Sequence, residues 1–424
     1  MQAQSWRPGI GLVVLILAMT AAVVVGIALY VPYDGRTVYS SGQLRSYQRS
    51  PDIKWTSDLS ALQPPGAVVS VAGVAGSTWL VQSSINQDNV FATIDAGSGR
   101  RRGGPAIDTG FGGCAIAVDG TIGCSVQSPL DNRPDGFYST TADGILGSRH
   151  DAPAATQIVA QGPDFLLANN IESTVSRITR DGKTVWQKTF DSAPKITTTD
   201  GSLIVRTAGA RTYLLDPTNG HERHSCIACE ATAFPDGIAL QQNGNERSVQ
   251  FFTLDGRLVA TARAQELVRG PSSLPLVTGA SGTGELPATQ GTFVAHDPAT
   301  RTALWKATSP ELSTGGAFTC GDLAVLRKFD DSRSILELRT GKQLGKVPTA
   351  TGGDPRADIR TLQCLGATPS RMVAADGAGL LTAFNTRNAA VEWQTPDALG
   401  GTPAIVDGYL TVVANGALTV LQPN

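Results

Sequence analysis

The chain has 424 residues, with 34 Lys and Arg against 36 Asp and Glu, which gives a net charge of −2. Only 17% of the residues are charged and 41% are hydrophobic, so the composition excludes both a disordered acidic segment and a protein that binds nucleic acid through a strongly basic surface. The 47 glycines and the low aromatic content of 6% favour a protein with many turns and short strands.

The first element in chain order is an uncharged apolar segment at residues 9–31. A helix of this length covers about 34 Å, and the hydrocarbon core of a bilayer is about 30 Å thick. The segment is longer than the usual apolar region of a cleaved signal peptide, although Gly26 and Ala28 leave cleavage open as an alternative. We therefore expect a short cytoplasmic amino terminus at residues 1–8 and a transmembrane signal anchor at residues 9–31.

The six cysteines indicate on which side of the membrane the rest of the chain lies. Their number is even and they lack paired zinc-knuckle spacing, so we expect disulfides, which persist in oxidising compartments. This predicts a single-pass protein of the cell membrane with its carboxyl-terminal domain outside the cytoplasm. The excess of arginine over lysine hints at a GC-rich bacterium. The polar residues 32–52 are predicted to form a tether, and residues 53–424 the folded domain.

The domain repeats one pattern, an apolar strand followed by an acidic or polar turn, and the chain beyond residue 60 has no long amphipathic helical stripe. The copies recur about every 41 residues, which is the length of a four-stranded propeller blade, so we expect an all-β propeller. They lie at residues 90–99, 137–144, 175–182, 212–220, 250–256, 292–301, 335–341 and 380–388, with a last copy at 417–422.

Tryptophans recur in phase with these turns. Trp186, Trp305 and Trp393 each follow a turn by four or five residues, and Trp55 lies in a similar strand at the start of the domain. Because the last copy supplies three strands and then ends, we expect residues 53–57 to complete the last blade as its outer strand. Such closure removes open sheet edges, and an equivalent indole in several blades would fill the wedge between neighbours.

The repeat resembles that of quinoprotein-type, or PQQ-like, propellers, whose signature is Ala-x-Asp-x-x-Thr-Gly-x-x-x-Trp with the Trp docked on the next blade. Residues 295–305 match every fixed position of this signature except the glycine, which is replaced by Arg301. The resemblance covers residues 53–424 and implies eight blades. Seven or nine remain open, because the unit around residues 272–305 matches poorly.

Similarity of fold does not carry the quinone chemistry with it. Quinoprotein dehydrogenases use adjacent cysteines, a catalytic Asp and calcium ligands, whereas this chain has no Cys-Cys pair and its Asp residues cluster in turns. It also lacks a Gly-x-Ser-x-Gly elbow, a Walker loop and a His-Glu-x-x-His motif. We expect no cofactor and no catalytic residue, and a non-enzymatic role is favoured over an enzymatic one.

The densest group of reactive side chains is formed by His221, His224, Cys226 and Cys229. Thiolates and neutral imidazoles are usual zinc ligands, so these four residues are a candidate metal site. Thiol redox chemistry and free thiols are further alternatives. We favour a structural disulfide between Cys226 and Cys229 that pins the connection between two blades.

Two further disulfides are predicted. Cys114 and Cys124 flank a turn at residues 119–120, and antiparallel pairing would bring them opposite each other. Cys320 and Cys364 occupy similar places in successive repeats, where they could link neighbouring blades. Burial as free cysteines is the alternative for all four.

These observations predict a membrane-anchored, extracytoplasmic propeller that acts as a protein-interaction scaffold of the bacterial cell envelope. Its expected partners are other envelope or membrane proteins, and the membrane through residues 9–31, but not nucleic acid. The alternative is a ligand-binding sensor or an enzyme that holds a quinone, a sugar or a metal in the propeller funnel.

Overall fold

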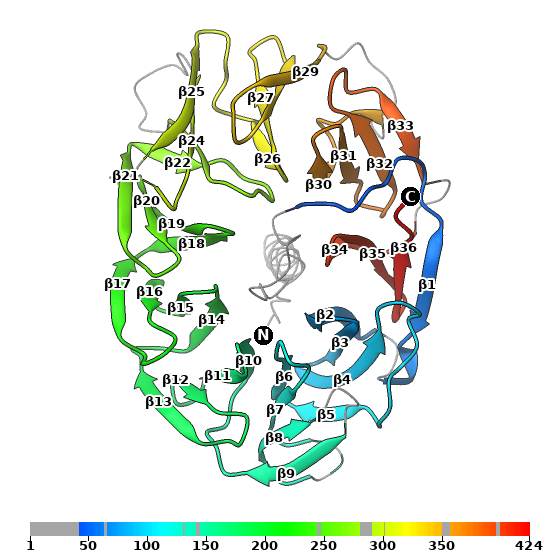
Figure 1. Ribbon diagram of the computed structural model, residues 1–424, viewed down its shortest axis with the longest axis vertical. Helices are drawn as coiled ribbons and strands as arrows, with labels where there is room; N and C mark the ends of the chain where they lie inside the picture. Colours follow the sequence, from blue (N-terminus) through cyan, green and yellow to red (C-terminus); the bar gives the residue numbers. More distant parts are fainter. Residues whose placement is uncertain are drawn as a thin grey trace, which may run out of the picture. The chain divides into compact units, whose positions relative to one another are not determined.

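The structure is a computed structural model that describes residues 42–62, 66–129, 131, 133–140, 145–243, 247–279, 291–300, 302–349, 357–395 and 399–424. Over these residues 36 strands form nine four-stranded sheets, with one short 3-10 helix, η1 (Ser60–Leu62) (Figure 1). No helix within the described ranges has the length and apolar character needed to span a bilayer. The segments predicted as cytoplasmic terminus and membrane anchor, 1–8 and 9–31, lie outside the described residues.

Each sheet is one blade of a propeller, and the blades are numbered 1 to 9 along the chain. Blades 1 to 3 consist of β2 (Val68–Ala75), β3 (Thr78–Ile85), β4 (Asp88–Asp95) and β5 (Ile107–Gly110); β6 (Gly113–Ile116), β7 (Ile122–Val126), β8 (Gly136–Thr140) and β9 (Leu146–His150); and β10 (Gln157–Gln161), β11 (Asp164–Asn169), β12 (Thr174–Ile178) and β13 (Thr184–Thr189).

Blades 4 to 6 follow with the same order of strands, from the inner strand to the outer strand. Their strands are β14 (Pro194–Thr198), β15 (Leu203–Thr207), β16 (Arg211–Leu215) and β17 (Glu222–Ile227); β18 (Cys229–Phe234), β19 (Gly237–Gln242), β20 (Ser248–Thr253) and β21 (Leu258–Arg263); and β22 (Gln265–Leu267), β23 (Leu276–Gly279), β24 (Gly291–His296) and β25 (Ala303–Ser309).

Blades 7 to 9 complete the ring, and the last of them combines the two ends of the domain. They are formed by β26 (Phe318–Cys320), β27 (Leu323–Arg327), β28 (Arg333–Glu337) and β29 (Gln343–Val347); by β30 (Gln363–Thr368), β31 (Arg371–Ala375), β32 (Leu381–Asn385) and β33 (Val391–Gln394); and by β34 (Thr402–Val406), β35 (Tyr409–Ala414), β36 (Ala417–Leu421) and β1 (Ile53–Asp58).

The core lies between adjacent blades. The middle strands are covered by a neighbouring sheet on both sides, so several of them carry continuous apolar runs, as at residues 323–326 of β27. One cluster, for example, joins Leu166 and Val175 of blade 3 to Ile196 and Val205 of blade 4. Outer strands such as β13 are mostly exposed. The continuous apolar runs in the sequence therefore mark strands that are buried on both faces.

The blade number is nine, so the expected value of eight was wrong. The unit that matched poorly, around residues 272–305, is blade 6, in which β23 pairs with both β22 and β24. Residues 280–290, which separate β23 from β24 in the sequence, lie outside the described residues. The inner strand β22 is short and follows β21 after Ala264 alone, which hides it in the sequence pattern.

The ring is closed by the strand expected to do so. β1 pairs with β36 in antiparallel register, with Trp55 opposite Val420 and Asp58 opposite Ala417. The last blade thus takes three strands from the carboxyl end of the chain and its outer strand from the beginning of the domain. The apolar cluster around Trp55 includes residues of blades 1 and 9, so burial of apolar surface also favours the closed ring.

The order of the strands defines two faces of the ring. Because successive strands are antiparallel, the turns between first and second strands and between third and fourth strands lie on one face. The turns between second and third strands, and the crossings to the next blade, lie on the other. We call the first the strap face, because residues 42–52 (the strap) cross it, and the second the crossover face.

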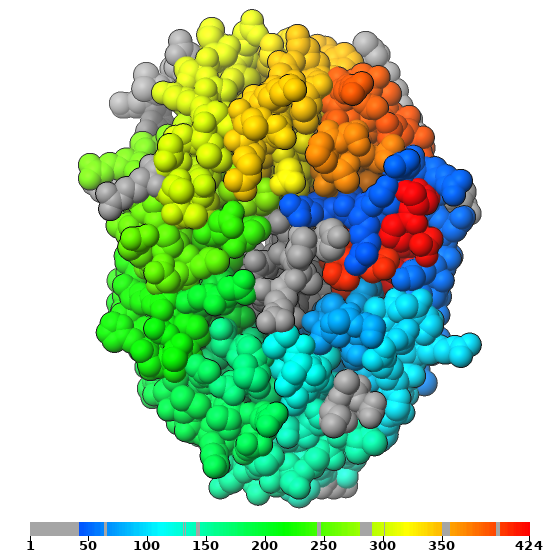
Figure 2. Space-filling model, in the orientation of Figure 1, coloured from blue at the N-terminus to red at the C-terminus, as the bar shows by residue number. Residues whose placement is uncertain are grey.

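The strap is the described part of the segment predicted to be a tether, 32–52, and it packs on the ring. The carbonyl oxygen of Gly42 accepts a hydrogen bond from the backbone N–H of Ala367 beside the inner strands. Farther along, Tyr47 is 2% exposed, and Arg45 forms an ion pair of 2.9 Å with Asp407. The strap thus runs from the inner strands to β1, and Figure 2 shows it in blue next to the red carboxyl-terminal strands.

Candidate interaction surface

Each of the four tryptophans predicted to dock blades donates its indole N–H to a backbone carbonyl oxygen outside its own blade. Three donate to the turn between the third and fourth strands of the next blade: Trp55 to Ala96 at 3.0 Å, Trp186 to Pro217 at 3.0 Å and Trp305 to Leu338 at 2.7 Å. A glycine of the same turn lies under each ring, where an added Cβ would fall within 2.4–2.8 Å of the indole: Gly99, Gly220 and Gly341. The glycine of the repeat is therefore required by the indole above it.

Trp393 of blade 8 has a different acceptor. The next blade is blade 9, whose third and fourth strands, β36 and β1, come from opposite ends of the domain and share no turn. The indole N–H of Trp393 donates to the backbone carbonyl oxygen of Tyr47 at 3.0 Å. The strap therefore supplies at this junction the acceptor that a turn supplies elsewhere.

Two blades without a tryptophan fill the docking position with other side chains, which sequence analysis missed. His150 at the end of β9 covers Gly182 of blade 3, and Arg223 of β17 covers Gly256 of blade 5. The guanidinium of Arg223 also donates to the carbonyl oxygen of Gly201 at 2.7 Å and pairs with Asp216 at 2.8 Å. Their sequence trace is weak: His150 and Arg223 precede their glycines by 32 and 33 residues, close to the 34 that separate Trp186 from Gly220, but neither residue type belongs to the repeat signature.

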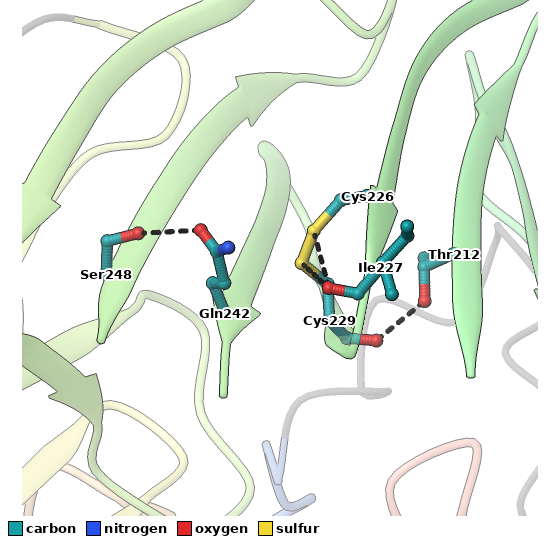
Figure 3. Close-up of a disulfide and its surroundings, with 6 residues drawn as sticks. All are labelled: Thr212, Cys226, Ile227, Cys229, Gln242 and Ser248. Carbon is teal, nitrogen blue, oxygen red and sulfur yellow. Dashed lines mark hydrogen bonds between the residues drawn. A yellow bond between two sulfur atoms is a disulfide. The ribbon is translucent and has the colours of Figure 1, made fainter. Parts of the chain in front are cut away.

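The structure joins Cys226 to Cys229 as a disulfide across the crossing from β17 to β18, with Cα atoms 5.8 Å apart. Figure 3 shows both sulfurs next to the carbonyl oxygen of Ile227, at 3.8 and 3.6 Å. The hydroxyl of Thr212 donates to the carbonyl oxygen of Cys229 at 2.7 Å, which ties the crossing to blade 4. Ala228 between the strands has a φ of 57°, so the chain turns a sharp corner there.

The candidate metal site contains no free thiol, because the disulfide uses both cysteines, and a zinc site of this kind needs thiolates. His224 packs against Phe252, with ring centroids 4.8 Å apart. Burial lowers the pKa of His224, with a hydrogen bond to Gln250 acting in the opposite direction. No group of three or more His, Cys, Asp or Glu within the described ranges has a geometry that would hold a metal ion.

The other four cysteines also form disulfides. Cys114 and Cys124 are directly opposite in the β6–β7 ladder, with Cα atoms 4.1 Å apart. Cys320 of β26 and Cys364 of β30 join the inner strands of blades 7 and 8, with Cα atoms 5.9 Å apart. The second bond therefore spans a junction between blades, whereas the first lies within one blade.

The crossover face carries exposed apolar side chains on its loops. Ile171 in the β11–β12 turn is 86% exposed, Ile227 at the β17–β18 crossing 62%, and Phe329 in the β27–β28 turn 53%. Phe111 at the β5–β6 crossing is 47% exposed. Single exposed apolar residues are ordinary, but side chains of this size on loop tips are available to contact another protein.

Comparison with known proteins gives a family match over the later blades of the propeller. The family model described as "Outer membrane protein assembly factor BamB" matches residues 171–423. No curated protein sequence matches the chain. Among solved structures, BamB from Moraxella catarrhalis has 12% identity and a TM-score of 0.44, covering 88% of this chain and 99% of that one.

Two further solved structures show comparable similarity. The computationally designed Ika8 protein has 11% identity and a TM-score of 0.41, covering 90% of this chain and 100% of its own. The Dos1 propeller has 11% identity and a TM-score of 0.40, covering 92% and 96%.

The repeated sheets and the side chains docked over turn glycines define a β-propeller of PQQ-like repeats. Since the family match covers more than half of the sequence, the chain belongs to the family of the outer membrane protein assembly factor BamB.

Proposed function

We propose that the protein is a membrane-anchored, extracytoplasmic scaffold of the bacterial cell envelope that binds other envelope proteins through its crossover face. The membership in the BamB family supports this role, because the family description names an assembly factor of the outer membrane. The anchor is the apolar segment 9–31, and the disulfides favour an oxidising compartment. The alternative of a ligand in the funnel gains no specific observation.

The path of the strap is the observation that carries the proposal. Gly42 lies beside Pro271 and Gly321, in the turns between first and second strands, so the chain reaches the ring on the strap face. The strap therefore covers part of the strap face, and we propose that the crossover face is the one turned toward partners. The crossover face, with Ile171 and Phe329 on its loops, would then be the face that approaching proteins meet first.

Site-specific crosslinking in intact cells tests which face of the ring binds partner proteins. A photo-crosslinking amino acid replaces Ile171 or Phe329 on the crossover face and, as matched controls on the strap face, Val118 or Ile145, which are also exposed apolar residues. We expect covalent adducts with specific membrane or envelope proteins from the first pair and not from the second. Adducts only from the strap face, or none from either, would contradict the proposal.

Charge substitution gives an independent check. Ile171→Asp and Phe329→Asp should abolish co-purification of the crosslinked partner, because an Asp would be buried in an apolar contact. Both positions are exposed, so the free energy of unfolding should change by less than about 0.5 kcal/mol. Val118→Asp is the matched substitution on the strap face and should leave the partner bound.

A further inference from the structure

Blade 7 presents three arginines together at its crossover end. Arg327 ends β27 and Arg333 begins β28, and the two residues are directly opposite in the ladder. Arg360, in the crossing from β29 to β30, approaches Asp331 of the β27–β28 turn at 3.7 Å. Like charges directly opposite each other destabilise a sheet, so this arrangement calls for a compensating anion.

The described carboxylates of the cluster are engaged by two of the three arginines. Asp331 pairs with Arg327 at 2.9 Å, and Asp358 accepts from Arg360 with its two oxygens at 2.8 and 2.9 Å. Three guanidinium groups and two carboxylates leave one positive charge in excess. That excess charge belongs to Arg333.

Arg333 is buried without a carboxylate partner in the described part of the chain. Its residue exposure is 8%, and its one hydrogen bond there runs from Nη1 to the carbonyl oxygen of Gly316, at 2.8 Å. Its Nε atom is buried and has no hydrogen-bond partner among the described residues. Burial lowers the pKa of Arg333, and Arg327 and Arg360 act in the same direction, whereas the carboxylates of Asp331 and Asp358 act in the opposite one. An unpaired buried charge is costly, which is a reason to expect a ligand.

An apolar anchor lies next to this cluster. Phe329 in the same turn is 53% exposed, and its backbone N–H donates to the carbonyl oxygen of Glu311, which fixes the turn. The side chain of Arg327 is 39% exposed, so the cluster is open to solvent on this side. A cluster of guanidinium groups in a loop region that also carries an exposed aromatic residue fits a peptide with a carboxylate next to an apolar side chain.

We propose that Arg327, Arg333 and Arg360 form a receptor for a carboxylate of a partner protein, whose neighbouring apolar side chain packs on Phe329. The inference rests on the proposed scaffold function and adds the chemistry of the partner, an acidic and apolar segment. Bound in this way, the carboxylate supplies the direct ion pair that Arg333 does not form with any described residue, and guanidinium groups bind carboxylates with two parallel hydrogen bonds.

Peptide titration tests the receptor directly. The probe is a fluorescein-labelled hexapeptide of alternating Asp and Phe, and the matched neutral peptide has Asn in place of Asp; binding to the full-length chain in detergent is followed by fluorescence anisotropy. We expect the neutral peptide to bind at least about tenfold more weakly. Arg333→Gln should weaken binding of the acidic peptide by a similar factor. Equal affinity for the two peptides would overturn the inference.

Two further variants separate loss of binding from loss of fold. Asp331→Asn removes a negative charge from the cluster and should tighten binding of the acidic peptide several-fold, a gain that unfolding cannot produce. Arg339→Gln is the matched control on the strap face, where Arg339 is 58% exposed, and it should bind normally. If neither Arg333→Gln nor Asp331→Asn changes the affinity, the receptor is wrong. Crosslinks from position 329 in cells would then still support the scaffold function.

Discussion

Two neighbouring junctions of the ring solve the same packing problem in opposite ways. Between blades 6 and 7, the large Trp305 lies over Gly341, which has a φ of +69°. Between blades 7 and 8 the corresponding residues are Gly345 and Ala389. Trp305 and Gly345 occupy equivalent positions, since each pairs with the third strand one step before a β-bulge.

The two junctions differ in which blade fills the space between them: the indole of Trp305 at the first, and the turn backbone of blade 8 at the second. At Gly345 an added Cβ would collide with the carbonyl oxygens of Thr386 and Arg387, so the turn of blade 8 approaches the backbone directly. The backbone N–H of Lys346 donates to the carbonyl oxygen of Arg387 at 3.0 Å. This same junction carries the Cys320–Cys364 disulfide. The repeat thus preserves the fit between blades, whereas the residues that achieve it vary.

The largest expected effect comes from the disulfide between blades 7 and 8. Cys320→Ala combined with Cys364→Ala opens a loop of 44 residues and should lower the free energy of unfolding by about 4 kcal/mol if the bond acts through chain entropy. Urea unfolding of the purified chain measures it. The matched control opens Cys226–Cys229, with a separation of 3, and should cost about 2 kcal/mol. Equal losses would show that loop length does not govern these bonds.

A double-mutant cycle at Trp305 and Gly341 measures the coupling energy between the indole and the turn glycine beneath it. Trp305→Gly should cost about 3 kcal/mol, because the half-buried indole and its hydrogen bond to Leu338 are lost. Gly341→Ala forces a Cβ to within 2.7 Å of the indole and a left-handed backbone onto alanine, so it should cost about 2–3 kcal/mol.

In the Trp305→Gly background the collision is absent, so Gly341→Ala should cost only about 1 kcal/mol for its backbone. The coupling energy is then about 1–2 kcal/mol, measured by urea unfolding of the four proteins. Gly162→Ala is the matched control, since Gly162 has a φ of +60° and open space around its Cβ position. Additive effects at Trp305 and Gly341 would contradict the steric account.

Periodicity and turn chemistry predicted the all-β propeller, because each blade needs its own apolar strands and turn residues, and these recur in the sequence. The closure of the ring by residues 53–57 could be predicted because the last repeat in the sequence supplies only three of its four strands. The copies found in the sequence also number nine, in agreement with the nine sheets of the described residues, whereas the expected value of eight came from the family resemblance.

The period of the sequence did not predict the docking roles of His150 and Arg223 or the arginine cluster of blade 7. His150 and Arg223 do the work of tryptophan, but nothing in their local sequence says so, since the constraint comes from a glycine of the next blade. Arg333 and Arg360 are brought together by the crossing between two blades. Contacts between repeats depend on three-dimensional register, which the period of a sequence does not contain.

The smallest expected effect concerns the junction of blades 4 and 5, where an arginine replaces tryptophan and adds an ion pair. Burial alone would raise the pKa of Asp216, but the backbone N–H of Thr218 and the guanidinium of Arg223 outweigh it, so the pKa lies below its usual 3.8. The stabilisation from this carboxylate is therefore complete above about pH 4 and is lost as the pH falls through the lower pKa of the folded protein.

Arg223→Met keeps much of the packing over Gly256 and removes the charge. At pH 7 it should lower the free energy of unfolding by about 1 kcal/mol or less, because both side chains are partly exposed. Below about pH 4 the difference from the wild type should shrink, since protonated Asp216 no longer gains from the guanidinium. Urea unfolding at pH 7, 5 and 3 measures this. A difference that stays constant with pH would mean that the charge of Arg223 contributes nothing at this junction.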